Sequence, residues 1–467
     1  MFLFAVLLGQ ARAASVTLSP GDDVAAFTSS LLPGDVIQFR AGTYTIPSRL
    51  TWVGLGTAEA PIKLQAEAGA EVILEGTMND YVIVIDDSSY IEVRNLTIRQ
   101  AEGSEGVGGI VVDDSSNVLI EDLEIGPLGR TAMYLAGDDS ALTVRNNHMH
   151  DIGHGSALYA GCGDASCWLQ GSTISGNWIH DVVDEYGYGL YIDNGGQDNT
   201  VTDNVIYNST YRGAALTSTE YGPPNVFEGN AIWGVGDIGL LLTGTATVRN
   251  NLVFNVGGVG IYARDGGRDT LANLVIAHNT VANSDSHGVY VEGWAAREGM
   301  VLANNAVANP TGRAFYAGEN HVSEQNRIVG NVFTGLVDGL DPLAGQYTPG
   351  NGFGDFMDAS GWDFYPSAGS ALVGAADPSS ESWVPTIDFN GTARSGSSPD
   401  VGAYERTVNA NPGWAIQEGF KELAGGSNSD PSKQVGGCCS DGGSEDSTAQ
   451  VVFLLPFGLM GWRRRRC

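Results

Sequence analysis

VRNNHM at residues 144–149 is one copy of a phrase that returns about every 26 residues. The phrase opens and closes on an apolar residue and carries Asn at its fourth position. Two earlier copies, at 93–98 and 120–125, carry Leu96 and Leu123 in place of Asn. A fixed period of this length with strand-like alternation is the signature of a solenoid. The copies with Asn begin at Val144, Ile174, Val201, Phe227, Val248, Ile276, Leu302 and Ile328.

Each copy alternates apolar and polar residues, which predicts a short strand with one buried face. A second strand opened by Gly follows in several coils, for example at 189–193 and 260–264. One coil cannot bury its apolar face alone, so the coils are expected to stack into a continuous core. Helical periodicity is nearly absent from residues 90–340. The sequence therefore predicts an all-β parallel β-helix.

The Asn residues of the phrase are predicted to stack as a ladder at one bend. Asn tolerates left-handed turn geometry, and stacked amides can hydrogen-bond along a column. We interpret the ladder as structural. Its members are Asn147, Asn177, Asn204, Asn230, Asn251, Asn279, Asn305 and Asn331.

On these residues the chain resembles the right-handed parallel β-helix superfamily, the pectate-lyase-like proteins, over residues 14–345. The resemblance implies an N-terminal capping helix at GDDVAAFTSSL (21–31) and a closing segment of the β-helix at 346–406. The phrase IDFNGTARSGSSPDVGAYE (387–405) looks like such a closing segment. We interpret its charged residues as an ion-pair and turn network rather than a catalytic site: Asp388, Arg394, Asp400 and Glu405.

Charge and composition exclude some classes of partner. The 54 acidic residues outnumber 23 basic ones, and the net charge of −31 argues against nucleic acid. The 65 glycines and the 42% hydrophobic content fit a turn-dense β protein in one long solenoid. We expect a monomer whose partner is a polysaccharide.

Both ends of the chain suggest export. Residues 1–13 read as a signal peptide cleaved before Ala14. A polar linker (407–449) precedes a hydrophobic and Arg-rich tail (450–467), whose apolar run is too short to span a bilayer. The tail resembles the myxobacterial C-terminal sorting signal, which implies processing near Cys438 or Cys439. A plain tail anchor is the alternative. We expect an exported protein at the cell surface or outer membrane, or released outside, with membrane contact only through the tail.

Cys162 and Cys167 lie inside GCGDASC. In an exported protein this spacing favours a small disulfide loop, because a metal site would need further ligands nearby.

Two columns of outward-facing residues can be aligned coil by coil. Exposed aromatic faces on a rigid sheet suit stacking against sugar rings; the alternative is that they only stack on each other. We assign sugar contact to Tyr159, Tyr207, Trp233 and Tyr262, with Asp193 beside them. The first column is His150, His180, Tyr207, Trp233, Phe254, Ala282 and Ala308; the second is Tyr134, Tyr159, Tyr191, Ala215, Leu241, Tyr262, Tyr290 and Tyr316.

The bend between the columns is widened in two coils. The columns are eight residues apart in five later coils, but nine apart from His150 to Tyr159 and eleven from His180 to Tyr191. Functional loops usually depart from a regular scaffold. The extra length is expected to bring together His154, Asp184, Glu185 and Tyr186, close to the Cys162–Cys167 loop.

The predicted constellation has His150 or His180 as base, Tyr191 as acid and Arg212 against a substrate carboxylate. Asp184, Glu185 and Asp193 would bind a cation or act as an acid–base pair. Ca²⁺ is the candidate ion, also for NGGQD (194–198) and DGGRD (265–269), which tight turns explain as well.

The resemblance implies lyases that depend on Lys or Arg with calcium. No Lys lies between Lys63 and Lys421, which excludes a Lys base in the central coils. The predicted function is an exported surface protein that binds and modifies polysaccharide by lyase- or epimerase-like action on a uronate-containing glycan. The alternative is a non-catalytic adhesin or structural β-helix protein.

Overall fold

The computed structural model describes residues 14–422, except 29–30, 220–221, 268–269, 319–320, 342–343, 379–380 and 395–397. The described residues lie in one compact unit. The predicted signal peptide (1–13), the sorting tail (450–467) and the processing residues Cys438 and Cys439 lie outside the described residues. In the described part of the chain, no helix is long and apolar enough to cross a membrane.

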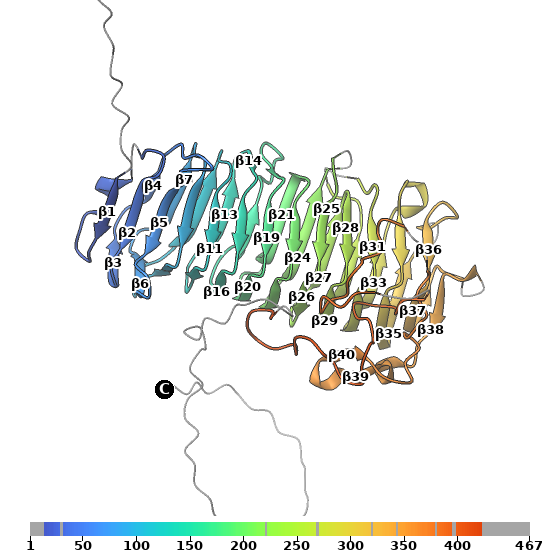
Figure 1. Ribbon diagram of the computed structural model, residues 1–467. Helices are drawn as coiled ribbons and strands as arrows, with labels where there is room; N and C mark the ends of the chain where they lie inside the picture. Colours follow the sequence, from blue (N-terminus) through green and yellow to red (C-terminus); the bar gives the residue numbers. More distant parts are fainter. Residues whose placement is uncertain are drawn as a thin grey trace, which may run out of the picture. The chain divides into compact units, whose positions relative to one another are not determined.

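The fold is a stack of coils whose strands pair in parallel with the coils before and after (Figure 1). The first strand of each coil belongs to a 13-stranded sheet, and most of these strands are the openings of the repeated phrase. Their bounds are β1 Ser15–Leu18, β2 Val36–Phe39, β5 Ile62–Ala66, β8 Ile91–Arg94, β11 Leu119–Glu121, β15 Thr143–Arg145, β19 Thr173–Ser175, β22 Thr200–Thr202, β25 Asn225–Glu228, β28 Ala246–Arg249, β31 Val275–Ala277, β34 Val301–Ala303 and β36 Arg327–Val329.

The other strands form a 23-stranded sheet with two rows, joined where β35 (Ala306–Ala317) and β37 (Asn331–Asp338) run through both. The row after the ladder bend is β3 Gly42–Ile46, β6 Val72–Gly76, β9 Thr97–Gln100, β12 Glu124–Ile125, β16 His148–Ile152, β20 Trp178–Val182, β23 Val205–Ser209, β26 Ala231–Trp233, β29 Leu252–Val256, β32 Thr280–Ser284 and β38 Tyr347–Pro349. The next row is β4 Leu50–Trp52, β7 Tyr81–Asp86, β10 Gly108–Asp113, β13 Met133–Ala136, β17 Leu158–Ala160, β21 Tyr188–Gly196, β24 Arg212–Ser218, β27 Ile238–Thr243, β30 Val259–Ala263 and β33 His287–Val291.

The alternation of the phrase builds the core. Ile120, Val144, Ile174 and Val201 pair with one another in register and are fully buried. Each inward row repeats this stacking, so the core is one continuous hydrophobic cluster along the coils. The predicted all-β solenoid is confirmed.

The Asn ladder is also confirmed. Asn177 Nδ2 donates to Asn204 Oδ1 at 2.9 Å, and Asn204 Nδ2 donates to Asn230 Oδ1 at 2.9 Å. Each amide oxygen also accepts the backbone N–H of the residue at the same position in the previous coil, as Asn204 does from Asn177 at 3.0 Å. The left-handed residue is the one before the ladder Asn, such as Asn146 or Asp203, rather than the ladder Asn itself. The ladder Asn is therefore selected for its hydrogen bonds.

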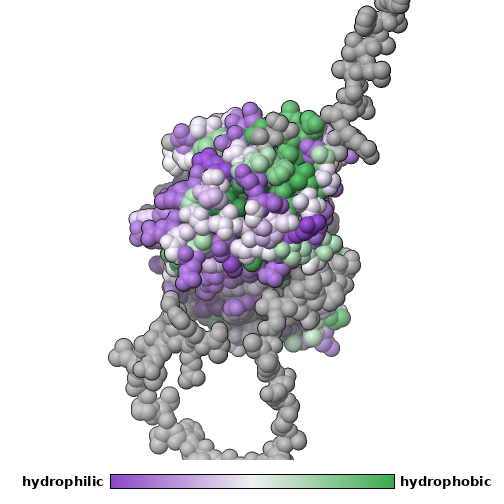
Figure 2. Space-filling view, turned by 90° about the vertical axis from the view of Figure 1, so that its left-hand side faces the viewer, coloured by the Kyte–Doolittle hydropathy of each residue, from purple (hydrophilic) through white to green (hydrophobic). Residues whose placement is uncertain are grey.

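The predicted capping helix at 21–31 is wrong. The structure has only a 3-10 turn, Val24–Phe27, whose preceding Asp23 makes no capping bond with its side chain. Strand β1 already pairs with β2 at this end, and Val24 is the only residue of the turn that is buried. Figure 2 looks onto this end and shows an apolar patch among polar surface. Leu32, Val53 and Leu55 of the first coils are exposed.

The segment after the last coil turns back along the side of the stack instead of closing its end (Figure 1). It contains the short elements η4 Gly352–Asp355, β39 Phe356–Asp358, η5 Ala359–Gly361 and β40 Asp363–Pro366. Phe364, Tyr365, Phe389 and Trp414 form a second core against Phe254 and its neighbours. Packing continues to Lys421, whose ammonium donates to Asp203 at 2.7 Å. The packed chain thus extends beyond the predicted linker boundary at 406/407.

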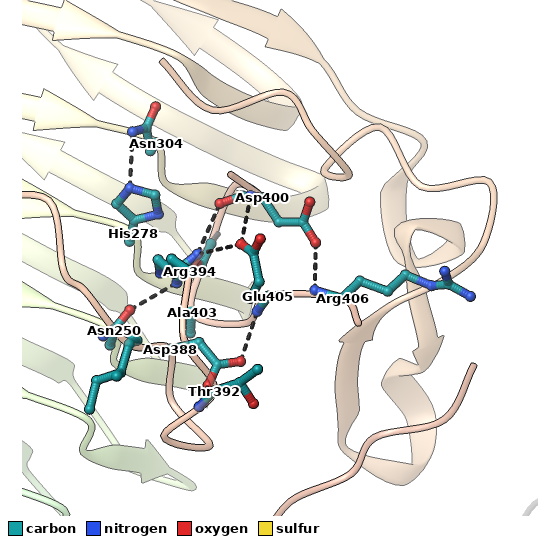
Figure 3. Close-up of polar contacts among 12 residues, drawn as sticks. Asn250, His278, Asn304, Asp388, Thr392, Arg394, Asp400, Ala403, Glu405 and Arg406 are labelled. Carbon is teal, nitrogen blue, oxygen red and sulfur yellow. Dashed lines mark hydrogen bonds and ion pairs between the residues drawn. The ribbon is translucent and has the colours of Figure 1, made fainter. Parts of the chain in front are cut away.

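The charged residues of 387–405 form the predicted structural network (Figure 3). Arg394 donates to Asn250 Oδ1 at 2.9 Å and to the Gly402 carbonyl at 2.7 Å, and pairs with Glu405 at 3.5 Å. Asp388 accepts the backbone N–H of Glu405 at 2.8 Å. Asp400 accepts from Arg406 N at 2.6 Å. Most of these bonds shape the returning segment itself, and the bond from Arg394 to Asn250 holds it against the coils.

Candidate functional site

A surface of tyrosines follows the third row of strands. Tyr134, Tyr159 and Tyr191 pair in register, with ring centroids 5.2 and 5.3 Å apart. Tyr81 lies 6.5 Å from Tyr134, and Tyr188 lies 4.4 Å from Tyr191. These rings are half-buried. We call Tyr81, Tyr134, Tyr159, Tyr188 and Tyr191 the tyrosine surface; it confirms the alignment of the second column in these coils.

Asp193 ties this surface together. Its carboxylate accepts from Tyr159 Oη at 2.6 Å and Tyr191 Oη at 2.7 Å. Asn194 donates both its backbone and side-chain N–H at 2.7 Å, and Thr217 Oγ1 lies at 3.2 Å. Asp193 is 3% exposed. Its oxygens are occupied by protein donors, which makes Asp193 an organiser of the surface rather than a group open to sugar or Ca²⁺.

The tyrosines in this cluster are poor proton donors. Burial and then the hydrogen bond to the Asp193 carboxylate raise the pKa of both Tyr159 and Tyr191 far above the ordinary value. A general acid works best with a pKa near the working pH. The assignment of Tyr191 as catalytic acid therefore finds no electrostatic support.

An open groove of about 700 Å³ adjoins the tyrosine surface. Tyr81 and Tyr134 line it together with Arg49, Asp80 and Asp113. The Cys162–Cys167 disulfide, which forms as predicted, lines the groove as well. Sequence reasoning placed the site two coils further along and missed this groove. The available signal was a repeated acidic phrase, DDSS at 86–89 and 113–116 and DDS at 138–140.

Among the carboxyl groups that line the groove, Asp113 has a raised pKa. Burial, and after it the negative charges of Asp114, Asp86 and Asp87, raise the pKa of Asp113 above the ordinary range. A Cβ on Gly137 would lie 2.4 Å from Asp113 Oδ1 and 2.6 Å from Asp114 Oδ1, so both carboxyl groups crowd this glycine. A perturbed carboxyl in a groove is a functional candidate.

Two arginines bring positive charge to the groove and to the Tyr81 ring beside it. Arg49 pairs with Asp80 at 2.7 Å, and both side chains are partly exposed. Arg130 lies over the Tyr81 ring at 5.6 Å and donates to Asn79 at 2.9 Å. The groove therefore combines aromatic faces, guanidinium groups and a carboxyl with a raised pKa.

The widened bend is held by Asp184. Its carboxylate accepts the backbone N–H of Gly155 at 2.8 Å and of Tyr186 at 2.7 Å, and it pairs with His154. Asp184 is 7% exposed. The Asp184 carboxylate is thus already engaged in shaping the loop, which does not support its predicted role as cation ligand or acid–base group. Glu185 is exposed.

Arg212 is likewise engaged. Its Nε donates to Asp237 at 3.0 Å and its Nη1 to Tyr188 Oη at 2.8 Å, while the Tyr211 ring lies 4.2 Å away. The side chain is 14% exposed. A substrate carboxylate would have to displace Asp237, so the predicted role of Arg212 finds no support.

The later half of the first column is covered, and the prediction that its ring faces are open is wrong. Tyr207 and Trp233 are 4% exposed because the returning segment packs over this row. Trp362 lies 5.5 Å from Trp233. No sugar can stack on Tyr207 or Trp233 in this arrangement. Tyr262 stays half-buried and stacks on Tyr290 at 4.6 Å.

The histidines of the first column form a separate cluster with two residues that sequence reasoning missed, His148 and Glu124. His148 Nε2 lies 2.8 Å from His180 Nε2, and His150 Nε2 lies 3.5 Å from Glu124 Oε1. His148 also stacks on Trp178 at 3.8 Å. The alternation of HMHD at 148–151 was the available signal, since it places two imidazoles on one face.

Burial sets the protonation of this cluster. Burial, and then the neighbouring imidazoles, lower the pKa of His148 to about 3. Burial also lowers the pKa of His180, against the opposing effect of Asp181. Burial opposes protonation of His150 as well, but the nearby carboxylates of Glu124 and Asp151 outweigh it and raise its pKa.

The histidine cluster and the tyrosine surface are two sites. The histidines extend from the row after the ladder bend, and the tyrosines extend from the next row. Among the described residues, no hydrogen bond, ion pair or ring contact joins His150 or His180 to Tyr191. The residues of the predicted constellation therefore lie on two different rows of strands, on either side of the bend, and the constellation stays a prediction.

One group in the described part of the chain could hold a metal ion through three or more His, Cys, Asp or Glu side chains: Glu124, His148 and His150. No three carboxylates among those residues bring their oxygens within the same reach of one another. Of the predicted cation ligands, Asp184, Glu185 and Asp193 are not part of that group. Residues 268–269 of the predicted turn at 265–269 lie outside the described residues.

Comparison with known proteins agrees with the fold. The family model described as right handed beta helix region matches residues 81–220 and 170–307. No curated protein matches significantly. Among solved structures, pectate lyase Pel9A is similar with a TM-score of 0.53 and 16% identity, covering 85% of this chain and 98% of that chain.

The A-module of mannuronan C-5 epimerase AlgE6 from Azotobacter vinelandii has a TM-score of 0.50 and 16% identity, covering 68% of this chain and 89% of that chain. The catalytic domain of a GH87 α-1,3-glucanase is less similar, with a TM-score of 0.44, 15% identity and 68% of each chain covered. The similar structures thus include a polysaccharide lyase, an epimerase and a glucanase. The chain carries a right-handed β-helix region, and its fold resembles that of pectate lyase.

Proposed function

We propose that this chain binds polysaccharide along the tyrosine surface and modifies it in the adjoining groove, by lyase- or epimerase-like action on a uronate-containing glycan. One observation carries the proposal: Tyr81, Tyr134, Arg49 and Asp113 all line the same groove. The likeness to the fold of a pectate lyase and an epimerase is consistent with it.

The chemistry follows from these groups. Elimination and epimerisation of a uronate both begin when a base removes the proton next to the carboxylate, while positive charge stabilises the developing anion. A carboxylate with a raised pKa is the stronger base, and Asp113 has this property. The Arg49–Asp80 pair is exposed and so holds weakly, which leaves the guanidinium available to a substrate carboxylate. Asp113 therefore replaces the histidines as candidate base.

The rival function is a non-catalytic adhesin or structural protein. The saturated Asp193 and the raised pKa values of Tyr159 and Tyr191 favour it, because these groups organise a surface without being suited to proton transfer. Glycan binding without turnover is the outcome that would select this rival.

Export belongs to the proposal. It rests on the sequences of residues 1–13 and 450–467. We propose a secreted or surface-held protein processed near Cys438 or Cys439. Intact mass measurement of native material tests this: the mature chain should lack Arg463–Arg466, and a retained RRRRC end would contradict it.

The activity test is an ultraviolet assay for unsaturated uronate, with NMR detection of epimerised residues, on polymannuronate, polyguluronate and polygalacturonate. Asp113→Asn should lower turnover about 10²–10⁴-fold while glycan affinity is kept. Tyr134→Ala should lower affinity by removing a stacking face. Asp285→Asn, on an exposed residue of a later coil, is the matched control. Full activity of Asp113→Asn would refute the assignment of the base.

A further inference from the structure

Four side chains from three neighbouring coils meet on the row of strands after the ladder bend. Glu124 of β12 pairs in register with His148 of β16, and His150 of β16 pairs with His180 of β20. One ligand atom each from Glu124, His148 and His150 lies within 4.8 Å of the other two. His180 adds its Nε2 at 2.8 Å from that of His148.

The outer nitrogens of two rings are held by carboxylates. His150 Nδ1 lies 2.9 Å from Asp151 Oδ2, and His180 Nδ1 lies 2.7 Å from Asp181 Oδ2. A carboxylate accepts an N–H, so each Nδ1 carries a proton, and in the neutral form of each ring Nε2 presents a lone pair to the cluster. Histidines that bind metals are held in this way, with the second nitrogen donating to a carboxylate.

Of the inner nitrogens, His148 Nε2 and His180 Nε2 share one hydrogen bond, whereas His150 Nε2 has none. His150 Nε2 is buried, has no hydrogen bond, and lies 3.5 Å from the Glu124 carboxylate. A lone pair and a carboxylate that face each other repel, and either a proton on the ring nitrogen or a metal cation between the two groups removes this repulsion. A cation at this point would satisfy Glu124, His148 and His150 together.

We infer that Glu124, His148 and His150, with His180 beside them, bind a divalent transition metal of the zinc type. Imidazole nitrogen and carboxylate oxygen suit zinc, cobalt or nickel, whereas Ca²⁺ takes oxygen ligands. Ligands about 2.1 Å from a tetrahedral ion lie about 3.3 Å apart. The separations between these side chains bracket that value, so small rotations complete the site.

The surroundings favour retention of the ion. His148 stacks on Trp178 at 3.8 Å, and Phe420 of the returning segment packs edge-on against both rings at 6.4 and 5.6 Å. The side chains of His150 and His180 are 12% and 11% exposed. The metal would thus join three coils beneath the returning segment, independently of the tyrosine surface and of any activity there.

The test uses the full chain with Cys438, Cys439 and Cys467 replaced by serine, because free thiols also bind zinc. After chelator treatment and dialysis, isothermal titration with ZnCl₂ should show one site, and CoCl₂ should give visible d–d absorption. CaCl₂ should not compete. A chain that takes up no zinc or cobalt overturns the inference.

Glu124→Gln and His150→Gln should each weaken zinc binding at least about 100-fold. Loss of a residue that only orients a metal ligand typically costs about 10–100-fold in affinity, and loss of a ligand should cost at least as much. His287→Gln, a histidine stacked on Tyr290 in a later coil, is the control and should bind as the parent does. Unchanged affinity in both cluster variants overturns the inference.

A second measurement needs no variant, in case a substitution prevents folding. Zinc should protect His148, His150 and His180 of the parent from diethyl pyrocarbonate, with His287 modified equally with and without zinc. Equal modification of the cluster under both conditions overturns the inference.

Discussion

Replacing Asn204 by Leu should expose how much the Asn ladder stabilises the fold. The Asn204 side chain takes part in four hydrogen bonds. Its Nδ2 donates to the Ile174 carbonyl at 3.0 Å and to Asn230 Oδ1 at 2.9 Å. Its Oδ1 accepts from the backbone N–H and the Nδ2 of Asn177 at 3.0 and 2.9 Å. Leu has a similar volume and makes none of them.

The expected loss follows from the groups left without partners. Asn204→Leu strands two N–H donors of Asn177 in a fully buried column, while the Ile174 carbonyl stays in the parallel ladder of β19 and β22. Each unsatisfied buried group costs about 1–3 kcal/mol, and the added apolar burial offsets about 1–2 kcal/mol. We expect a net loss of about 1–4 kcal/mol in the free energy of unfolding.

Asn147→Leu is the matched comparison because Asn147 begins the ladder, next to Leu123. Its Oδ1 accepts only the backbone N–H of Leu123, at 3.1 Å, and its Nδ2 donates to Ile120 O and Asn177 Oδ1. Fewer donors are stranded, so the loss should be about half as large. Asn409→Ala, at an exposed Asn, should change stability by less than about 0.5 kcal/mol.

The assay is urea unfolding followed by circular dichroism and tryptophan fluorescence. Coincident transitions and an unchanged slope are required before the midpoints are compared, since coils can unfold in parts. The reasoning is refuted if Asn204→Leu is as stable as Asn409→Ala, or if Asn147→Leu loses more than Asn204→Leu.

Three further perturbations have defined outcomes. Burial, and after it the neighbouring aspartates, raises the pKa of Asp139 to about 8, so the folded protein keeps a proton that the unfolded chain releases near pH 4. The free energy of unfolding should therefore fall as the pH rises from about 4 to about 8. Urea unfolding of Asp139→Asn should show a smaller fall over the same range. If Asp113 is the base, Asp114→Asn should lower its pKa and move the acid limb of the pH–rate profile to lower pH; an unmoved limb counts against this. Lys421→Met leaves the Asp203 carboxylate without its buried partner and should speed proteolysis of residues 407–422. Lys63→Met, at a half-exposed lysine, is the control and should not change the rate of proteolysis.

The fold could be predicted from sequence because its information is local and repeated. The same phrase specifies strand, bend and ladder in coil after coil, as at Val144, Ile174 and Val201, and in-register stacking satisfies every copy in the same way. The Cys162–Cys167 disulfide was equally readable, since four residues separate the two thiols. The capping helix was not, because pairing of β1 with β2 overrides the weak helical pattern of 21–31.

The site depended on contacts between residues far apart in the chain. Tyr207 and Trp233 align with His150 in the sequence, yet Phe364 and Trp362 return to cover that half of the row, so alignment alone predicted exposure that packing removes. Sequence by itself determined which residues face outward from each coil. Tertiary structure decided which of these residues stay exposed. Burial, and the partners of groups such as Asp193 or Glu124, depend on neighbouring coils and on the returning segment, and the period of the repeat carries no information about either.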